Sequence, residues 1–191
     1  METNTKEEKR MWKVLKSEYL YRDTWLTARK DTVQLPNGNL IPSYYILEYP
    51  DWVNTLAITK EHKFIFIRQY RHGIQEVRYE LCAGVCDQTD ATPMDAAKRE
   101  LLEETGYGRG TWQEYMVISA NPSTMTNLTH VFLATDVEPV STQHLEATED
   151  LTVHLLSYEE VLELLRTDQI KQALHAAPLW KYVANENRKQ V

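Results

Sequence analysis

The sequence is poor in cysteine and has no long apolar run. Its 191 residues include only two cysteines, Cys82 and Cys86. Without further partners these form neither a disulfide framework nor a zinc site, so we interpret both as reduced packing residues. No apolar run approaches the length that spans a membrane, and the polar opening "METNTKEEKRMW" lacks the apolar segment of a signal peptide. These absences predict a cytoplasmic protein.

Positive charge is also in short supply. The chain has 21 Lys and Arg against 28 Asp and Glu, a formal net charge of −7. Nucleic-acid backbones and anionic membrane surfaces repel such a chain, so we expect neither as its main partner. A phosphorylated ligand remains compatible where metal ions mediate. The sequence has no repeat, low-complexity tract or linker, and its length suits one main domain with a small appended unit.

The first 49 residues carry strand patterns. Aromatic and β-branched residues alternate roughly in three segments, "WKVLKSEYLYRD", "WLTARKDTVQL" and "IPSYYILEY". Asn37-Gly38 between the last two predicts a tight hairpin turn whose two central residues both have positive φ. We therefore predict a small antiparallel β-unit over residues 1–49, with a frayed polar start of about ten residues, and a main domain over residues 50–191.

The main domain mixes strands and helices. "WVNTLAITK" and "KFIFIRQYR" predict two strands, and "RYELCAGVCD" predicts a strand that enters a glycine turn. Further strands are predicted in "WQEYMVISA", "THVFLATDV" and "LTVHLLS". One early helix and two late ones, over residues 158–166 and 168–186, complete the pattern. This order predicts an α/β fold, an α/β/α sandwich around a mixed sheet.

The early helix has clear start and stop signals. Thr92 suits the N-cap, Pro93 the first helical position, and Asp95 the acidic position of a capping box. Gly106 suits the left-handed residue that ends a helix. An apolar stripe through Ala97 and its neighbours predicts the side that faces the core.

Three glutamates crowd a neighbouring face of this helix, at positions 100, 103 and 104. Like charges at such spacing cost a helix about 0.2–0.5 kcal/mol per pair, and the helix dipole disfavours anions near the C-terminal end. One interpretation is a solvated acidic surface that Lys98 and Arg99 partly neutralise. The other is a site for Mg²⁺, which prefers oxygen ligands. Composition and spacing alone leave both open.

The segment Gly84 to Tyr107, "GVCDQTDATPMDAAKRELLEETGY", resembles the box of the Nudix hydrolase family. That pattern is glycine, five residues, glutamate, seven residues, then Arg-Glu-aliphatic-any-Glu-Glu-any-Gly-aliphatic. In this chain Asp90 replaces the first glutamate, one additional residue lies between Asp90 and Arg99, and Tyr107 replaces the last aliphatic residue. The first two departures precede the helix, so its acidic face should keep its geometry. The matching positions are Gly84, Arg99, Glu100, Leu101, Glu103, Glu104 and Gly106.

The resemblance implies a set of metal ligands. Glu100 and Glu104 would be the principal ligands of Mg²⁺, with Mn²⁺ as a substitute, and Glu103 a further ligand. Ala83 would contribute its backbone carbonyl, and Arg99 would hold a glutamate in place. Bound cations would neutralise a diphosphate, activate the attacking water and stabilise the leaving phosphate.

The flanking segments resemble the ADP-ribose pyrophosphatase and nucleoside-diphosphate-sugar branch of that family. "ELCAG", which begins at Glu80, resembles its "ELPAG" segment, and "RQYRHG" resembles a strand whose arginine, here Arg71, binds the diphosphate. Pro122 lies fifteen residues after Tyr107, where this branch has a proline. Glu80, Arg71 and Pro122 are therefore implied to lie at the substrate. The opening β-unit resembles the part of that branch which helps to build a homodimer.

The general base is expected on the loop "STQHLEATEDLTVHLLS". Glu149 matches the family's loop glutamate, and Glu146 is the alternative, since a loop carboxylate could reach a metal-bound water. We expect His72 and His130 to be structural. Trp25, Trp52 and Tyr44 are strand aromatics that could pack in the core, lie at a dimer contact or stack on adenine, and the sequence does not choose between these roles.

The resemblance thus implies a Mg²⁺-dependent Nudix hydrolase, a homodimer, that splits ADP-ribose or a related nucleoside diphosphate sugar into a nucleoside monophosphate and a sugar phosphate. One alternative is a sugar-nucleotide hydrolase of the GDP-mannose type. The other is a non-catalytic Nudix-like sensor. The complete set of helix glutamates argues against the sensor, because a sensor need not keep a self-repelling face.

Overall fold

The computed structural model describes residues 10–23 and 26–189, which belong to two compact units. The N-terminal unit comprises Met1–Pro50 with Asn121–Asn127, and the main unit comprises Asp51–Ala120 with Leu128–Val191. Trp25 and most of the polar start predicted to be frayed, residues 1–9, lie outside the described residues.

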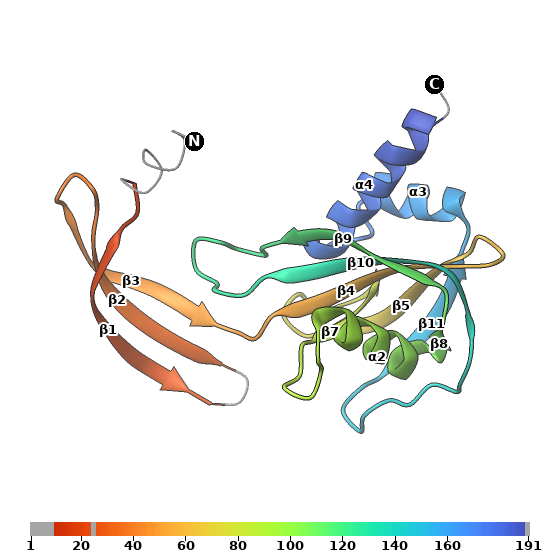
Figure 1. Cartoon of the computed structure of the whole chain (residues 1–191), viewed down its shortest axis with the longest axis horizontal. Helices are drawn as coiled ribbons and strands as arrows, with labels where there is room; N and C mark the ends of the chain where they lie inside the picture. Colours follow the sequence, from red (N-terminus) through yellow and green to blue (C-terminus); the bar gives the residue numbers. More distant parts are fainter. Residues whose placement is uncertain (1–9, 24–25, 190–191) are drawn as a thin grey trace. The chain divides into compact units, whose positions relative to one another are not determined.

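The N-terminal unit is a three-stranded antiparallel sheet in the order β1-β2-β3 (Figure 1). The three strands fall where the alternating pattern predicts them. Segment 121–127 joins this unit: Leu47 forms a bridge with Met125, and the Tyr44 hydroxyl donates to the Ser123 carbonyl at 2.6 Å. The strands are β1 (Lys13–Arg22), β2 (Thr27–Gln34) and β3 (Leu40–Glu48).

The turn between β2 and β3 differs from the prediction. Only Gly38 has positive φ, at 88°, and Asn37 is not among the positive-φ residues. The Gly38 N–H donates to Leu35 O, and the Leu35 N–H donates to Asn39 O, both at 2.9 Å. The connection is therefore a turn that has no positive φ at Asn37 and is followed by one glycine in the left-handed conformation. Pro36 explains the difference, because its fixed φ suits the second position of that turn and not a left-handed one.

The main unit contains an eight-stranded mixed sheet in the order β11-β5-β4-β10-β8, with β6 paired to β5, β7 to β4 and β9 to β10. Strands β4 and β10 run parallel, and the other pairs are antiparallel. The strands are β4 (Trp52–Thr59), β5 (Phe64–Arg71), β6 (Glu76–Glu80), β7 (Cys82–Val85), β8 (Tyr107–Gly108), β9 (Thr111–Ile118), β10 (Thr129–Pro139) and β11 (Leu151–Leu156).

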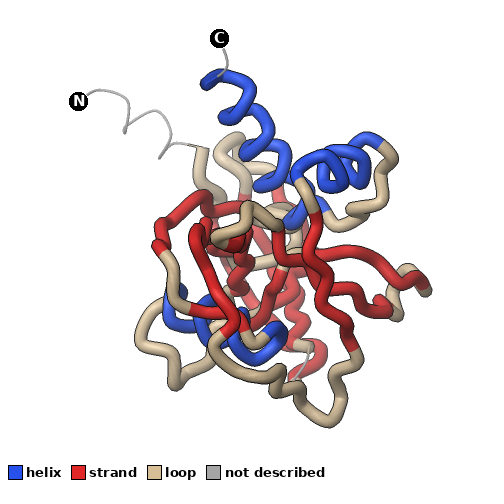
Figure 2. Tube along the Cα trace, turned by 90° about the vertical axis from the view of Figure 1, so that its right-hand side faces the viewer, coloured by secondary structure: helices blue, strands red, loops and turns tan. Residues whose placement is uncertain are grey.

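Helices cover both faces of this sheet (Figures 1 and 2). Helix α2 (Pro93–Thr105) lies on one face, and α3 (Tyr158–Arg166) and α4 (Ala173–Lys189) on the other. Alternate residues of β5 face opposite ways: Phe64 and Phe66 belong to the core that contains α3 and α4, and Ile65 and Ile67 to the core that contains Leu101 of α2. The predicted α/β/α sandwich around a mixed sheet is confirmed.

Two boundaries differ from the sequence prediction. Gly84 does not form a turn: it lies within β7 and pairs with Val53. The last helix begins at Ala173 and not at Asp168. Asp168, with a φ of 53°, closes α3, because its N–H donates to Leu165 O and that of Gln169 to Leu164 O. This is a Schellman ending, in which an aspartate takes the usual place of glycine.

No helix among the described residues has both the length and the apolar character needed to cross a membrane.

Candidate active site

Helix α2 places the three predicted glutamates in different environments. Its start and end follow the predicted signals: the Thr92 side chain accepts from the Asp95 N–H at 3.2 Å, and Gly106 ends the helix with a φ of 74°. Glu104 is only 4% exposed, whereas the Glu103 side chain is 43% exposed. The predicted acidic face is therefore partly turned toward the sheet.

Glu100 and Glu104 approach two neighbouring residues of β7. The Ala83 N–H donates to the Glu104 carboxylate at 3.2 Å. The Glu100 carboxylate lies so close to Gly84 that a Cβ at this position would overlap it. Glycine is needed at position 84 because the Glu100 side chain approaches the backbone so closely. Without a Cβ there, α2 can present both carboxylates beside Ala83 and Gly84.

The protonation of Glu104 reflects this crowding. Burial raises its pKa, the charge of Glu100 raises it further, and only hydrogen bonds such as that from Ala83 oppose the shift, so that the pKa is about 8. Burial also raises the pKa of Glu100, against the lowering effect of Arg99. No basic side chain of the described residues forms an ion pair with Glu104. Burial and the neighbouring negative charge thus disfavour the ionised form of Glu104, and a bound cation would favour it.

Arg99 organises the remaining acids. Its guanidinium donates to Asp90 at 2.9 and 3.1 Å, to Glu100 at 2.9 Å and to Glu103 at 3.0 Å. It also donates to the Val85 carbonyl at 3.1 Å. The Asp90 side chain is 8% exposed, and its hydrogen bonds with Arg99 lower its pKa. The aspartate that departs from the Nudix pattern therefore anchors the arginine that holds two of the glutamates.

The loop acids differ in their relation to α2. The charge of Glu149 raises the pKa of both Glu100 and Glu104, so its carboxylate lies within electrostatic reach of them. The Glu146 N–H donates to the Glu149 carboxylate at 2.9 Å. Glu146 is not among the main causes of either pKa shift. The structure thus brings Glu149 toward α2 and uses the backbone of Glu146 to orient it.

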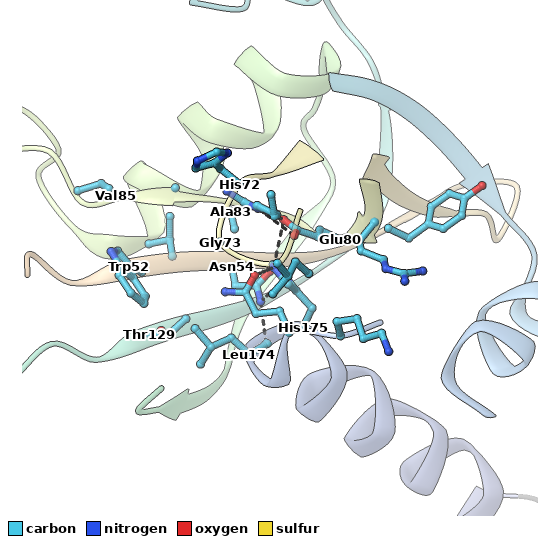
Figure 3. Close-up of a pocket in the computed structure, with 18 residues that line it drawn as sticks. Trp52, Asn54, His72, Gly73, Glu80, Ala83, Val85, Thr129, Leu174 and His175 are labelled. Atoms are coloured by element: carbon cyan, nitrogen blue, oxygen red, sulfur yellow. Dashed lines mark hydrogen bonds and ion pairs between the residues drawn. The ribbon is translucent and has the colours of Figure 1, made fainter. Parts of the chain in front are cut away.

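Ala83 and Gly84 also line a cavity of about 570 Å³ (Figure 3). Arg71 and Glu80 also line it. The Arg71 guanidinium donates to the Glu80 carboxylate at 2.9 and 3.0 Å, and Glu80 is only 3% exposed. The two residues predicted to lie at the substrate are therefore paired with each other at the cavity wall.

His175 belongs to this cluster and was missed by the sequence prediction. It lies on α4, 1% exposed, with Nε2 at 3.6 Å from the Glu80 carboxylate and 2.9 Å from Gln172 Oε1. Burial would raise the pKa of Glu80, but hydrogen bonds from His175 and Arg71 lower it to about 2. A histidine among the apolar residues of a terminal helix carries no local signal of this role, because Glu80 and Asn54, which it contacts, lie on distant strands of the sequence.

The other residues discussed in the sequence analysis have different environments. Pro122 belongs to the N-terminal unit, so it is not placed relative to α2. His130 pairs with Asp51 at 3.1 Å, in keeping with a structural role, whereas His72 lines the cavity. Tyr44 packs edge to face on Trp12 within the N-terminal unit. Cys82 and Cys86 are free thiols, and burial raises the pKa of both.

The oxygen ligands suit a hard divalent cation. Among the described residues, no three His, Cys, Asp or Glu side chains are gathered into a complete metal site. Arg99 pairs with both Glu100 and Glu103, and the carboxylates of Glu100 and Glu104 lie beside Gly84 and Ala83 of β7. Two carboxylates with a backbone carbonyl, completed by water and substrate phosphates, are typical of Mg²⁺ sites.

Comparison with known proteins agrees with this geometry. Residues 12–47 match the model of the nucleoside diphosphate sugar hydrolase N-terminal domain, and residues 49–177 match that of the NUDIX domain. An ADP-ribose pyrophosphatase of Bacillus subtilis is 27% identical over 162 residues, which cover 84% of this chain and 86% of the relative. A GDP-mannose pyrophosphatase of Salmonella arizonae is 28% identical over 161 residues, 78% of this chain and 83% of the relative.

A solved structure described as an ADP compounds hydrolase has the same fold. It superimposes with a TM-score of 0.80 at 23% identity and covers 94% of this chain and 95% of its own. The match of the NUDIX model extends over about two thirds of the chain and includes both α2 and the cavity wall. This chain belongs to the Nudix family.

Proposed function

We propose that the chain is a Mg²⁺-dependent pyrophosphohydrolase that cleaves the diphosphate of ADP-ribose or a related nucleoside diphosphate sugar. The products are a nucleoside monophosphate and a sugar phosphate. The observation that carries the proposal is Glu104, a buried carboxyl group that forms no ion pair with any described basic side chain, beside Glu100 and next to a cavity lined by Arg71. Nudix hydrolases generally need a divalent metal, and the ADP-ribose pyrophosphatase relative supports the substrate class.

The proposed ligands are the carboxylates of Glu100 and Glu104 and the Ala83 carbonyl, with Glu103 as a further, more exposed ligand. A bound divalent cation, Mg²⁺ or Mn²⁺, would neutralise phosphate charge and lower the pKa of the attacking water. Arg99 holds Glu100 and Glu103 by ion pairs, so its role is to position ligands. Cation binding would also remove the mutual repulsion of the buried carboxylates.

We propose Glu149 as the general base. Its charge already acts on Glu100 and Glu104, and the hydrogen bond from the Glu146 backbone fixes its carboxylate. From this position Glu149 would take the proton of the attacking water. Glu146 is the reserve candidate, and comparing the pH profiles of E149Q and E146Q distinguishes the two.

Arg71 is proposed to bind the diphosphate. Its side chain is 43% exposed and lines the cavity, and the pair with the buried Glu80 holds the guanidinium at the wall. Glu80 thus acts on the substrate through Arg71, as a positioning residue. Pro122 remains a prediction of the family resemblance.

A panel of nucleotide sugars tests the substrate class. With Mg²⁺ present, we expect phosphate-monoester products from ADP-ribose, and the GDP-mannose pyrophosphatase relative makes GDP-mannose the second candidate. Release of monoester from GDP-mannose at higher kcat/KM than from ADP-ribose would favour that alternative. Binding of the panel without any turnover would favour the sensor and contradict the proposal.

The N-terminal unit is proposed to mediate a homodimer, with residues 1–49 as the dimerisation unit and residues 50–191 as the catalytic domain. All ten residues of β1 are exposed, and they include apolar side chains such as Val14, Leu15 and Leu20, each about half exposed. Such a surface is typical of a protein–protein contact. Light scattering of the L15E/L20E variant should give a monomer where the unaltered chain gives a dimer. A cytoplasmic location and the lack of nucleic-acid or membrane partners stay predictions.

A further inference from the structure

Two buried oxygen atoms in the cavity wall have no hydrogen-bond partner among the residues that the structure describes. They are Asn54 Oδ1 and Thr129 Oγ1, on residues that are 1% and 2% exposed. Both residues line the cavity of about 570 Å³ (Figure 3). Buried polar atoms in proteins are nearly always satisfied, so two unsatisfied ones in a single cavity require an explanation.

The two residues share one face of the sheet. Asn54 lies on β4 and pairs with Val131 of the parallel strand β10, and Thr129 lies two residues before Val131. Residues two apart on a strand point to the same side, so Thr129 and Asn54 are diagonal neighbours on that side. Each oxygen is itself buried, so the cavity wall must shift slightly before a group that enters the cavity can contact both.

The orientation of the Asn54 amide is fixed by its neighbours. Its Nδ2 donates to the Leu174 carbonyl at 2.8 Å and lies 3.1 Å from His175 Nδ1 (Figure 3). The reversed amide would place Oδ1 against the Leu174 carbonyl oxygen, and two acceptors cannot share a hydrogen bond. The free atom is therefore the carbonyl oxygen, an acceptor, which needs an N–H or O–H donor. The Thr129 hydroxyl can donate or accept.

We propose that Asn54 and Thr129 form a polar subsite that recognises an adjacent donor and acceptor on the substrate and so determines specificity. The inference rests on the proposed function, because it concerns the end of the nucleoside diphosphate sugar that occupies this cavity. A sugar hydroxyl provides both functions in one group, and the edge of a purine provides them in two. Ala83, Gly84 and Arg71 line the same cavity, so a ligand whose diphosphate lies at Arg71 shares this cavity with Asn54 and Thr129.

The variant T129V removes the hydroxyl with little change of volume, and T129S is the matched control that keeps it. Binding is measured by calorimetry in the presence of Mg²⁺ with adenosine monophosphate and, separately, ribose 5-phosphate. Neither ligand contains a diphosphate, so no turnover complicates the titration. We expect T129V to weaken binding of one of the two about tenfold, the size of one lost hydrogen bond, and T129S to bind as the unaltered chain does.

The ligand that is affected identifies the end that enters the cavity: the base if adenosine monophosphate weakens, the sugar if ribose 5-phosphate does. N54L removes the acceptor and should weaken the same ligand. Asn54 also binds the Leu174 carbonyl and contacts His175, so the thermal melting of N54L is first compared with that of the unaltered chain. If N54L does not fold, the comparison of T129V with T129S decides.

The subsite is overturned if T129V binds both ligands like the unaltered chain, which would mean that solvent satisfies the two oxygens. It is equally overturned if neither ligand binds the unaltered chain. The proposed function fails separately: a chain that releases no monoester from any nucleotide sugar, yet loses affinity in T129V alone, would retain the subsite and not the activity.

Discussion

Two glutamates of the main unit are almost equally buried and yet have opposite electrostatic environments. Glu80, at the end of β6, is 3% exposed, and Glu104, on α2, is 4% exposed. Burial raises the pKa of each. At Glu80 the hydrogen bonds and charges of His175 and Arg71 reverse this effect and give a pKa of about 2, whereas at Glu104 the charge of Glu100 adds to it and gives a pKa of about 8.

The difference shows that burial alone does not determine whether a glutamate is ionised or what it does in the site. A buried carboxylate with its basic partners in the chain is complete, and it can position a neighbour such as Arg71. A buried carboxylate without a cation costs free energy that a metal ion can recover. We therefore assign Glu80 to the scaffold of the cavity and Glu104 to the metal, and each prediction below tests that distinction.

The largest effect is expected from E104Q. The amide keeps the shape of the side chain but cannot contribute a negative ligand, so we expect kcat to fall at least about 1000-fold. Monoester release from ADP-ribose measures it. E163Q, at an exposed glutamate of α3, is the matched control and should keep full activity. Turnover of E104Q within tenfold of that control would remove Glu104 from the site.

E80Q should act on stability first. It leaves Arg71 and His175 without their buried anion, and we expect the free energy of unfolding to fall by about 2–3 kcal/mol. Urea unfolding with and without Mg²⁺ measures this loss. E104Q should not be destabilised in the metal-free state, because the amide replaces a carboxyl that burial already keeps protonated. Equal destabilisation of the two variants would erase the distinction between them.

G84A tests the close approach of Glu100 to β7. The new Cβ would overlap the Glu100 carboxylate and displace it, so we expect the affinity for Mn²⁺ to fall about 10- to 100-fold. G73A is the control for metal affinity, because a Cβ at that glycine would meet nothing within 4 Å. Metal binding unchanged in G84A would show that Glu100 does not need this position.

The pH dependence of metal-free stability should contain opposite contributions. The folded pKa of Glu104 lies above its unfolded value, so its stabilisation is present at acid pH and is lost as pH rises from about 4.5 through about 8. The folded pKa of Glu80 lies below its unfolded value, so its stabilisation is present above about 4.5 and is lost as pH falls toward about 2. Each limb should slope by up to about 1.4 kcal/mol per pH unit, the value for one proton. Unfolding of E104Q should lack the upper limb, and an unchanged profile would contradict the pKa of Glu104.

Much of this fold follows from local sequence signals. The limits of α2 follow from Thr92 and Gly106, and most of the strands follow from alternation of residue type, although β8 is not predicted and the one strand predicted across Glu80 is divided into β6 and β7. The start of α4 does not follow from such signals, because Asp168 closes α3 in a conformation that usually requires glycine. The turn at Asn37 was predicted wrongly because Pro36 outweighs the Asn-Gly signal.

Some residues of the site can likewise be recognised from local sequence, and others cannot. The α2 glutamates are contiguous in sequence, and their spacing with Gly84 makes them recognisable. The cluster of Asn54, Glu80 and His175 combines β4, β6 and α4, and only tertiary packing brings these residues together. No pattern within one segment indicates that Asn54 and Thr129 share a cavity.

The most direct test of the account is calorimetric titration of Mn²⁺ into the chain at pH 7 in buffers of different ionisation enthalpy. Because the pKa of Glu104 is about 8, metal binding must displace its proton, and we predict release of close to one proton per site in the unaltered chain and in E163Q. In E104Q both the proton release and most of the affinity should be lost. Tight Mn²⁺ binding to E104Q, or binding to the unaltered chain without proton release, would contradict the claim that this carboxylate is held for a metal ion.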